Sequence, residues 1–196
     1  MDKDYASGKW NHCEDTVGAW IYQFVQSYCR RGSILDLGCG SGNTGNELGE
    51  TSYRDYTGVD ISEVAVRKAT ERSVQNGRAG KNEYIKSDIL SYVPKKKHDV
   101  ILFRESIYNV PRALIKKTLD RYAHFLTEEG AFIVYLSRDG TEEVREIVGW
   151  IEANYRVAEK RWREAAASDA ARYYGDAFVL VFRAAGQFGE PTEHTR

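Results

Sequence analysis

The feature that most constrains the fold of this chain is a short apolar run that ends in a cluster of glycines. Residues Ser33 to Leu37 are mostly apolar, and Gly38-Cys39-Gly40-Ser41-Gly42 follows them directly. This order predicts a buried strand that ends in a tight turn, because glycine adopts backbone conformations that other residues avoid. Asn43 to Leu48 would then open a helix. A strand, a glycine-rich turn and a helix in succession predict an α/β sheet whose backbone a ligand can approach closely.

The rest of the chain alternates between strand-like and helical segments. The segments that read as further strands are 56–60, 83–86, 99–103 and 131–137. Helices are expected at 14–30, between Ser62 and Asn76, from Pro111 to about Leu126 with Leu114 facing inward, and at 142–152. Such alternation implies right-handed crossovers and a doubly wound sheet. Ligands of these sheets bind beyond the carboxyl ends of the strands.

The end of the chain departs from this alternation. Residues 155–162 and 177–183 are strand-like, but no convincing amphipathic helix separates them. We expect a sixth and a seventh strand joined as a long hairpin, which adds an antiparallel strand to a parallel sheet. The fold class is therefore α/β, with a mostly parallel, seven-stranded sheet whose last strand is antiparallel. Residues 1–184 would form one domain, with an N-terminal lid and helix at 1–30, and 185–196 would be a loose tail.

Composition narrows the class of partner. The chain has 196 residues, of which 42% are hydrophobic and 29% charged, as expected for one soluble globular domain. A net charge of −1 gives no overall positive field for nucleic acid or an anionic membrane. Three irregularly spaced cysteines fit a reducing cytoplasm, and they form no metal-ligand cluster with histidine. We expect a cytoplasmic monomer or homodimer with a small-molecule partner and no metal.

Four short motifs along the first two thirds of the chain carry the strongest functional signal. In Gly58-Val59-Asp60-Ile61-Ser62 a carboxylate stands at the end of the second strand, where it can accept two hydrogen bonds from a ribose diol. The chain resembles the class I S-adenosylmethionine-dependent methyltransferases in four motifs taken in order: 36–42, 59–62, 87–89 and 98–102. The resemblance covers about residues 33–137 and implies a Rossmann-like methyltransferase fold.

The resemblance also implies which residues contact S-adenosylmethionine. Asp36, Gly38 and Gly40 would line its methionine part, and Cys39 would be a small residue that fits the loop and not a nucleophile. The nucleoside contacts that the family pattern implies are Asp60 on the ribose, Ile61 on the adenine, Asp88 on the adenine amino group, Ile89 beside the ring, and Phe103. Without a ligand role, Asp60 and Asp88 would be ordinary strand-end or turn acids.

A nicotinamide cofactor is the alternative ligand for the same loop. Residues 40–45 also spell GxGxxG, and Asp60 follows about 20 residues later. However, Asp36 stands just before the glycines, and its charge would repel a pyrophosphate. S-adenosylmethionine has no phosphate and carries a cationic amino group and a sulfonium, which suit an acidic residue. The chain also leaves no room for the second domain of many dehydrogenases, although single-domain reductases exist.

The methyl acceptor is harder to read, because the enzyme mainly positions the acceptor, excludes water and, where necessary, removes a proton. Residues 104–108, Arg-Glu-Ser-Ile-Tyr, resemble the Glu-x-x-Tyr loop of small N-methyltransferases acting on metabolites or sugars. That resemblance implies two catalytic roles: Glu105 would orient an acceptor amine, and Tyr108 would pack against the methyl sulfonium. The alternatives are a local backbone cap for Glu105 and a core aromatic for Tyr108.

Other residues near the expected site suggest how the acceptor is held. Arg104 and Arg138 follow the fourth and fifth strands, and guanidinium groups favour carboxylate or phosphate. They predict an anionic or zwitterionic small acceptor. Tyr5, Trp10 and His12 precede the first helix, where they would close over the site as a lid. His12 is the best-placed candidate for a general base, since its pKa lies near neutrality.

The leading hypothesis is therefore an enzyme that moves a methyl group to nitrogen or oxygen of a small metabolite. The alternatives are an RNA or protein methyltransferase and a non-catalytic protein that binds S-adenosylmethionine. The sequence leaves open the identity of the acceptor, the choice between N- and O-methylation, the use of a general base and the oligomeric state.

Overall fold

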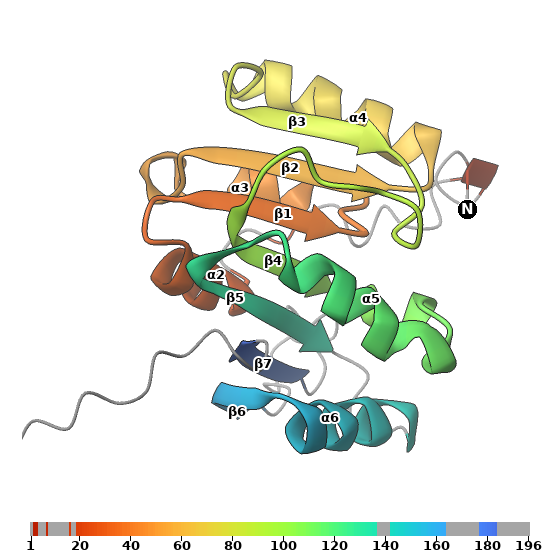
Figure 1. Ribbon diagram of the computed structural model, residues 1–196. Helices are drawn as coiled ribbons and strands as arrows, with labels where there is room; N and C mark the ends of the chain where they lie inside the picture. Colours follow the sequence, from red (N-terminus) through yellow and green to blue (C-terminus); the bar gives the residue numbers. More distant parts are fainter. Residues whose placement is uncertain are drawn as a thin grey trace, which may run out of the picture.

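The computed structural model describes residues 2–3, 7, 16, 19–136, 142–163 and 177–183. Within these residues, seven strands form one sheet in the order β3-β2-β1-β4-β5-β7-β6 (Figure 1). The strands are β1 (Ser33–Leu37), β2 (Asp55–Asp60), β3 (Asn82–Lys86), β4 (His98–Arg104), β5 (Leu126–Leu136), β6 (Arg156–Arg163) and β7 (Ala177–Arg183).

The strand directions agree with the sequence pattern. Strands β1 to β5 pair in parallel, and β7 is antiparallel to both β5 and β6. The predicted seven-stranded sheet and the antiparallel pairing of its last two strands are therefore confirmed, while the connection at 164–176 lies outside the described residues. The strand order reverses between β1 and β4, both of which end at the same edge of the sheet. A ligand crevice is expected at that reversal.

Helices cover both faces of the sheet (Figure 1). On one face lie α2 (Ile21–Cys29), α3 (Asn43–Glu47) and α4 (Glu63–Gln75), and on the other lie α5 (Ile115–Ala123) and α6 (Glu142–Asn154). The predicted boundaries of α4 hold, because the Ser62 hydroxyl accepts a hydrogen bond from the Ala65 N–H at 3.2 Å. No helix in the described ranges is both long enough and apolar enough to span a bilayer.

The region around Pro111 differs from the prediction of one helix over 111–126. Two short 3₁₀ helices, η3 (Ile107–Asn109) and η4 (Arg112–Leu114), precede α5, as η2 (Glu50–Ser52) precedes β2. Pro111 itself is extended, with ψ of 132°, so the α-helix cannot begin there. Leu114 consequently lies on a tight turn and is 36% exposed, not inward as expected. Leu126 belongs to β5, where it pairs with His98 across an irregularity in the ladder.

Candidate functional site

The turn after β1 is built from glycines in conformations that other residues avoid. Gly38, Gly40 and Gly42 have φ of +83°, +55° and +78°. The N–H groups of Gly38 and Cys39 both donate to the Val59 carbonyl oxygen, at 2.7 and 3.0 Å, which ties the turn to β2. A Cβ on Gly38 would lie 2.5 Å from the Cβ of Ser106, the residue that follows Glu105. The turn therefore packs directly against the loop after β4.

Cys39 is a buried spacer, as the sequence indicated. Its side chain fits because Gly58 has none: a Cβ at Gly58 would lie 2.8 Å from the Cys39 Sγ and 2.7 Å from the Tyr84 ring. Burial, followed by the nearby Asp36, raises the pKa of the Cys39 thiol well above its usual range. The thiol stays protonated, which is unsuited to a nucleophile.

Asp60 stands at the carboxyl end of β2 and organises the glycine turn. Its Oδ2 accepts from the Gly40 N–H at 2.9 Å and its Oδ1 accepts from the Ser62 N–H at 2.8 Å. A carboxylate has about four acceptor positions, so two remain for hydroxyl groups. Burial raises the pKa of Asp60, and the two N–H donors oppose this rise. The side chain thus has the structural role that the sequence left as one alternative, and its remaining acceptor positions leave room for the other.

Asp36 is a buried charge that is only half satisfied. Its Oδ2 accepts a hydrogen bond from the Tyr56 hydroxyl at 2.6 Å, but its buried Oδ1 has no partner among the described residues. Burial raises the pKa of Asp36 to about 6, although the Tyr56 hydroxyl and the positive charge of Arg104 oppose the rise. An unpaired buried carboxylate oxygen is costly, and a cationic group placed against it would remove the cost.

Arg104 is the last residue of β4, and it is only partly exposed. Its Nη1 donates to the Tyr22 hydroxyl at 3.0 Å, and its guanidinium lies over the Tyr22 ring, 5.2 Å from the centroid. The Tyr22 hydroxyl in turn donates to Glu47 Oε2 at 2.7 Å. Arg72 completes the chain with a bond to Glu47 Oε1 at 3.1 Å. These contacts place Arg104 beside Asp36 at the α2–α3 face of the sheet.

Tyr22, Glu47 and Arg72 were not among the residues predicted from the sequence. Tyr22 is one of the buried residues of α2, and the other two lie on α3 and α4. The sequence offers one indirect signal, because Glu47 follows the glycine turn by only five residues. The structure then shows that its side chain is 5% exposed. Burial of a glutamate so near a ligand loop requires partners. Those partners come from α2 and α4, which are distant in the sequence.

Glu105 and Tyr108 are brought together, as their proposed shared role requires. The Tyr108 hydroxyl donates to Glu105 Oε2 at 3.0 Å. Glu105 has φ of +54°, a left-handed conformation that costs a non-glycine residue free energy. Its N–H donates to the Tyr135 carbonyl at 3.0 Å, which fixes this conformation at the end of β4. Strained residues of this kind concentrate at functional sites.

The residues expected around the nucleoside differ widely in their exposure to solvent. Ile61 is 53% exposed beside Asp60, an unusual position for a large apolar side chain next to a buried carboxylate. Asp88 is exposed, and its Oδ1 accepts from the Leu90 N–H at 2.7 Å. Ile89 is partly buried, and its carbonyl accepts from the Tyr122 hydroxyl at 2.7 Å. Phe103 is fully buried in the core against Tyr122, so its ring presents no surface to a ligand.

Four candidate residues, Tyr5, Trp10, His12 and Arg138, lie outside the described residues. Nearby, the Asp2 carboxylate accepts a hydrogen bond from the Ser62 hydroxyl at 2.6 Å, so this part of the N-terminal segment lies at the carboxyl edge of the sheet (Figure 1). Among the described side chains, no group of three or more metal-ligating residues gathers.

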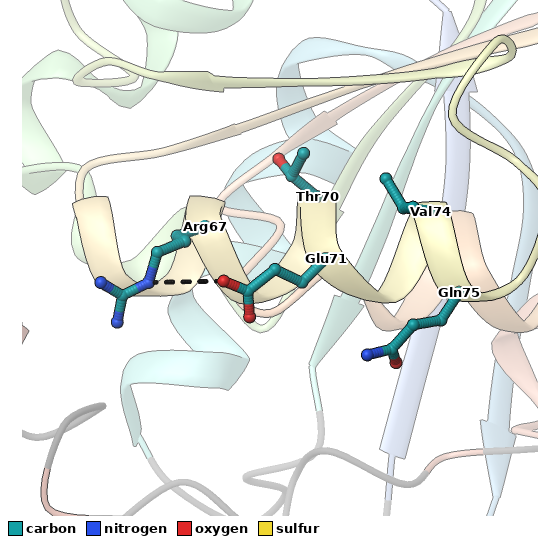
Figure 2. Close-up of a pocket in the computed structure, with 5 residues that line it drawn as sticks. All are labelled: Arg67, Thr70, Glu71, Val74 and Gln75. Atoms are coloured by element: carbon teal, nitrogen blue, oxygen red, sulfur yellow. Dashed lines mark ion pairs between the residues drawn. The ribbon is translucent and has the colours of Figure 1, made fainter.

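A second concave surface lies along α4 (Figure 2). Its lining residues are Arg67, Thr70, Glu71, Val74 and Gln75, all from the outer side of this one helix. Arg67 and Glu71 form an ion pair with each other at 3.8 Å. Ligand sites need polar groups that converge from several elements. Asp36, Asp60 and Glu105, at or next to the carboxyl ends of β1, β2 and β4, come from several elements, whereas the lining of the α4 surface comes from one helix.

Comparison with known protein families matches most of the chain. Residues 30–176 match the family model described as "Methyltransferase domain". A ribosomal protein L11 methyltransferase of Acetivibrio thermocellus is 29% identical over 115 residues, or 57% of this chain and 32% of that protein. The sterol 24-C-methyltransferase erg-4 of Neurospora crassa is 24% identical over 103 residues, or 52% of this chain and 27% of that protein. The chain thus spans about a third of the length of these relatives.

A solved structure matches over nearly the whole chain. The N-methyltransferase NodS from Bradyrhizobium japonicum WM9, in complex with S-adenosyl-L-homocysteine, superposes with a TM-score of 0.66. The two are 16% identical, and the match covers 94% of this chain and 100% of that one. At this identity the likeness shows the fold, and it confirms the predicted mixed seven-stranded sheet.

Proposed function

The chain belongs to the class I S-adenosylmethionine-dependent methyltransferases, and from this premise we propose that it methylates an amine nitrogen of a small acceptor. S-adenosylmethionine supplies an activated methyl group on a sulfonium when it is bound. The residues of the chain therefore have three tasks: to hold the cofactor, to orient the acceptor and to exclude water.

The residues present fit this cofactor. The unpartnered Oδ1 of Asp36 suits its cationic amino group, and the remaining acceptor positions of Asp60 suit two ribose hydroxyls. The exposed Ile61 gives an apolar surface for the adenine. The glycine turn leaves the backbone accessible between these groups, since no side chain projects from Gly38 or Gly40.

The observation that carries the choice of acceptor is the Glu105–Tyr108 hydrogen bond at the end of β4. In the proposal, the Glu105 carboxylate orients an acceptor amine by accepting its N–H, and Tyr108 packs beside the reacting centre. The structural neighbour NodS is described as an N-methyltransferase, which supports a nitrogen acceptor. Arg104 is not assigned to the acceptor in this proposal, because it lies on the α2–α3 face, where it bonds to Tyr22 and interacts with the charge of Asp36.

A protein acceptor is the second candidate function. One curated relative, at 29% identity, is a ribosomal protein L11 methyltransferase, and it supports a protein acceptor. An amine on a side chain or a terminus would meet Glu105 in the same way as a small amine. The two candidates therefore differ in the size of the acceptor and share the chemistry.

The test is an acceptor screen that measures release of S-adenosylhomocysteine from small amines, zwitterionic metabolites and lysine-containing peptides. We expect turnover with small amines, and a kcat/KM at least about tenfold lower for Glu105→Gln with unchanged cofactor affinity. Glu128→Gln, a glutamate near the opposite end of β5, is the matched control and should retain activity. Turnover confined to peptides would support the second candidate and contradict the first.

A further inference from the structure

We infer that Arg104 holds the carboxylate of the cofactor's methionine end, and that Tyr22 is a positioning residue that sets Arg104 for this task. The inference rests on the use of S-adenosylmethionine, and it goes beyond the expectation that Arg104 contacts the acceptor. Its basis is a group of charges on one face of the sheet. These are Asp36 on β1, Arg104 on β4, and the Tyr22–Glu47–Arg72 chain behind them.

Asp36 and Arg104 project from neighbouring strands toward the same face. Asp36 pairs in register with Leu102, and residues two apart on a strand share a face. Arg104 therefore lies on the side of Asp36, roughly 7 Å further along the strand direction, at about 3.3 Å per residue. The two charges influence each other's pKa: Arg104 opposes the rise in the pKa of Asp36, and Asp36 helps to raise that of Arg104 against burial.

The hydrogen bonds of these two side chains nevertheless go elsewhere. Asp36 bonds to Tyr56, whereas Arg104 bonds to Tyr22 at 3.0 Å and to the Thr44 hydroxyl at 3.5 Å. Both bonds of Arg104 use Nη1, so in the described part of the chain its Nε and Nη2 donors have no hydrogen-bond partner. Asp36 Oδ1 has none either. Asp36 thus has a buried acceptor oxygen and Arg104 has two donor nitrogens on the same face of the sheet, and no hydrogen bond joins them.

An amino-acid zwitterion satisfies both groups at once. Its ammonium group would donate to Asp36 Oδ1, and its carboxylate would accept from Arg104 in the fork geometry that guanidinium favours. A ligand with only an ammonium group, or only a carboxylate, would leave either the Arg104 donors or Asp36 Oδ1 without a partner. A dinucleotide would place the anionic pyrophosphate at the glycine turn, beside the negative charge of Asp36.

Tyr22 controls where the guanidinium of Arg104 lies. Its hydroxyl donates to Glu47 Oε2 at 2.7 Å, so its oxygen is turned to accept from Arg104. Burial raises the pKa of Tyr22 far above its usual range, so the hydroxyl keeps its proton. Glu47 is itself held by Arg72, which also bonds to the Ser41 carbonyl of the glycine turn at 3.1 Å. The position of Arg104 is therefore linked to the turn that holds the cofactor.

The N-terminal segment joins the same network through Thr16. The Thr16 hydroxyl donates to Glu47 Oε2 at 2.6 Å and lies 2.7 Å from the Tyr22 oxygen. Its N–H donates to Glu47 Oε1 at 3.2 Å. The position of Arg104 is thus coupled to Thr16 through Tyr22 and Glu47. Removal of the Tyr22 hydroxyl should therefore weaken both the hold on Arg104 and the hold on Thr16.

The test measures ligand affinity by calorimetry, without turnover. S-adenosylhomocysteine is compared with its decarboxylated analogue, 5′-(3-aminopropylthio)-5′-deoxyadenosine, which keeps the amino group and lacks the carboxylate. For Arg104→Gln we expect S-adenosylhomocysteine to lose affinity by roughly 10- to 100-fold, as for a charged hydrogen bond, while the analogue changes by less than about threefold. Tyr22→Phe should show the same selective loss, on the order of 3- to 10-fold. The loss is smaller because this variant displaces the guanidinium of Arg104 but leaves its charge in place.

Tyr28→Phe is the matched control, since Tyr28 lies on the same helix and its hydroxyl bonds to Glu159, away from the site. It should leave both affinities unchanged. An equal loss of both ligands in Arg104→Gln and Tyr22→Phe would overturn the inference, because it would show that the residues only support the fold. If Arg104→Gln does not fold, Tyr22→Phe decides alone by the same criterion. A wild-type protein that binds neither ligand would instead contradict the use of the cofactor.

Discussion

In the proposal, the two ends of the cofactor site are built on different physical principles. The residues proposed for the methionine end are the buried charges Asp36 and Arg104, which are fixed by hydrogen bonds to tyrosines. Those proposed for the nucleoside end, Ile61 and Asp88, are exposed, and the Asp88 carboxylate accepts a hydrogen bond from the Leu90 N–H. The first end is organised before the ligand arrives, and the buried charge of Asp36 destabilises the ligand-free protein at neutral pH. The residues of the second end are exposed, so each of their contacts should contribute less to the affinity for the cofactor.

The glycine turn that joins the two ends should give the largest effect. Gly38→Ala places a Cβ 2.5 Å from the Ser106 Cβ at a φ of +83°, so it adds a clash to an unfavourable backbone conformation. We expect a loss of unfolding free energy of about 3 kcal/mol, measured by urea denaturation, together with loss of S-adenosylhomocysteine binding.

Gly77→Ala is the matched control for that substitution. Gly77 has a φ of +70°, and a Cβ at this position would meet nothing within 4 Å. It should therefore lose only the backbone contribution, about 1 kcal/mol. Equal losses at the two glycines would show that packing against the loop after β4 does not matter.

Asp36→Asn should separate stability from binding. The folded-state pKa of about 6 lies above the ordinary value of 3.8, so at neutral pH the charged carboxylate disfavours the folded state. The variant should unfold at a higher temperature than the wild type, with a gain in unfolding free energy on the order of 2 kcal/mol near neutral pH. It should also bind S-adenosylhomocysteine at least about tenfold more weakly. A less stable variant would contradict the description of Asp36 as a strained charge.

The pH dependence of the wild type follows from the same pKa. Protonation of Asp36 removes the free-energy cost of burying its charge. Its unfavourable contribution to stability should therefore diminish as pH falls from about 6 toward 4. Binding requires the charged form, so affinity for S-adenosylhomocysteine should fall over the same range. Calorimetric titrations from about pH 4 to about pH 8, at roughly one-unit intervals, measure this, with Asp36→Asn as the reference that lacks this titration.

Asp60→Ala tests the middle of the crevice. The variant loses the acceptor for the Gly40 N–H and, in the proposal, for the ribose hydroxyls. We expect S-adenosylhomocysteine affinity to fall by about 1.5–3 kcal/mol, the range for hydrogen bonds to a charged group. A 2′,3′-dideoxy analogue should lose much less, since it makes no ribose bonds. A similar loss for both ligands would assign Asp60 to the turn alone.

Ile61→Ala should give the smallest effect and define the nucleoside end. Its side chain is 53% exposed, so its truncation should leave the unfolding free energy unchanged within about 0.5 kcal/mol. Affinity should fall by about 1 kcal/mol, from lost apolar contact with the adenine. Val74→Ala, at an exposed valine on α4, is the control and should change neither quantity. A loss at Ile61 as large as at Asp36 would remove the contrast between the two ends.

The parts of the fold that local patterns determine were predicted well. The glycine turn, the strand ends at Asp60 and the cap at Ser62 depend on residues close in sequence, and the structure confirms them. The start of α5 was placed too early, because Pro111 satisfies the preferences of a first helical turn and an extended residue equally. The early start of β5 at Leu126 depends on pairing with His98, which is a tertiary contact.

The site divides in the same way. Glu105 and Tyr108 are three residues apart, and their contact follows from a motif. The network of Tyr22, Glu47, Arg72 and Arg104 joins four separate elements, so no local pattern could reveal it. Arg104 is predicted to contact the acceptor because it follows the fourth strand and a guanidinium group favours anions. The structure adds its contact with Tyr22 of α2, which no local pattern indicates.

The most direct test of the contrast between the two ends compares S-adenosylhomocysteine with 5′-methylthioadenosine, which keeps the nucleoside and lacks the amino-acid group. Calorimetric titration of the wild-type protein near neutral pH gives both dissociation constants. If buried charges at the methionine end dominate recognition, S-adenosylhomocysteine should bind at least about 100-fold more tightly, as two charged contacts imply. Equal affinities would contradict the account, because binding would then come from the nucleoside end alone.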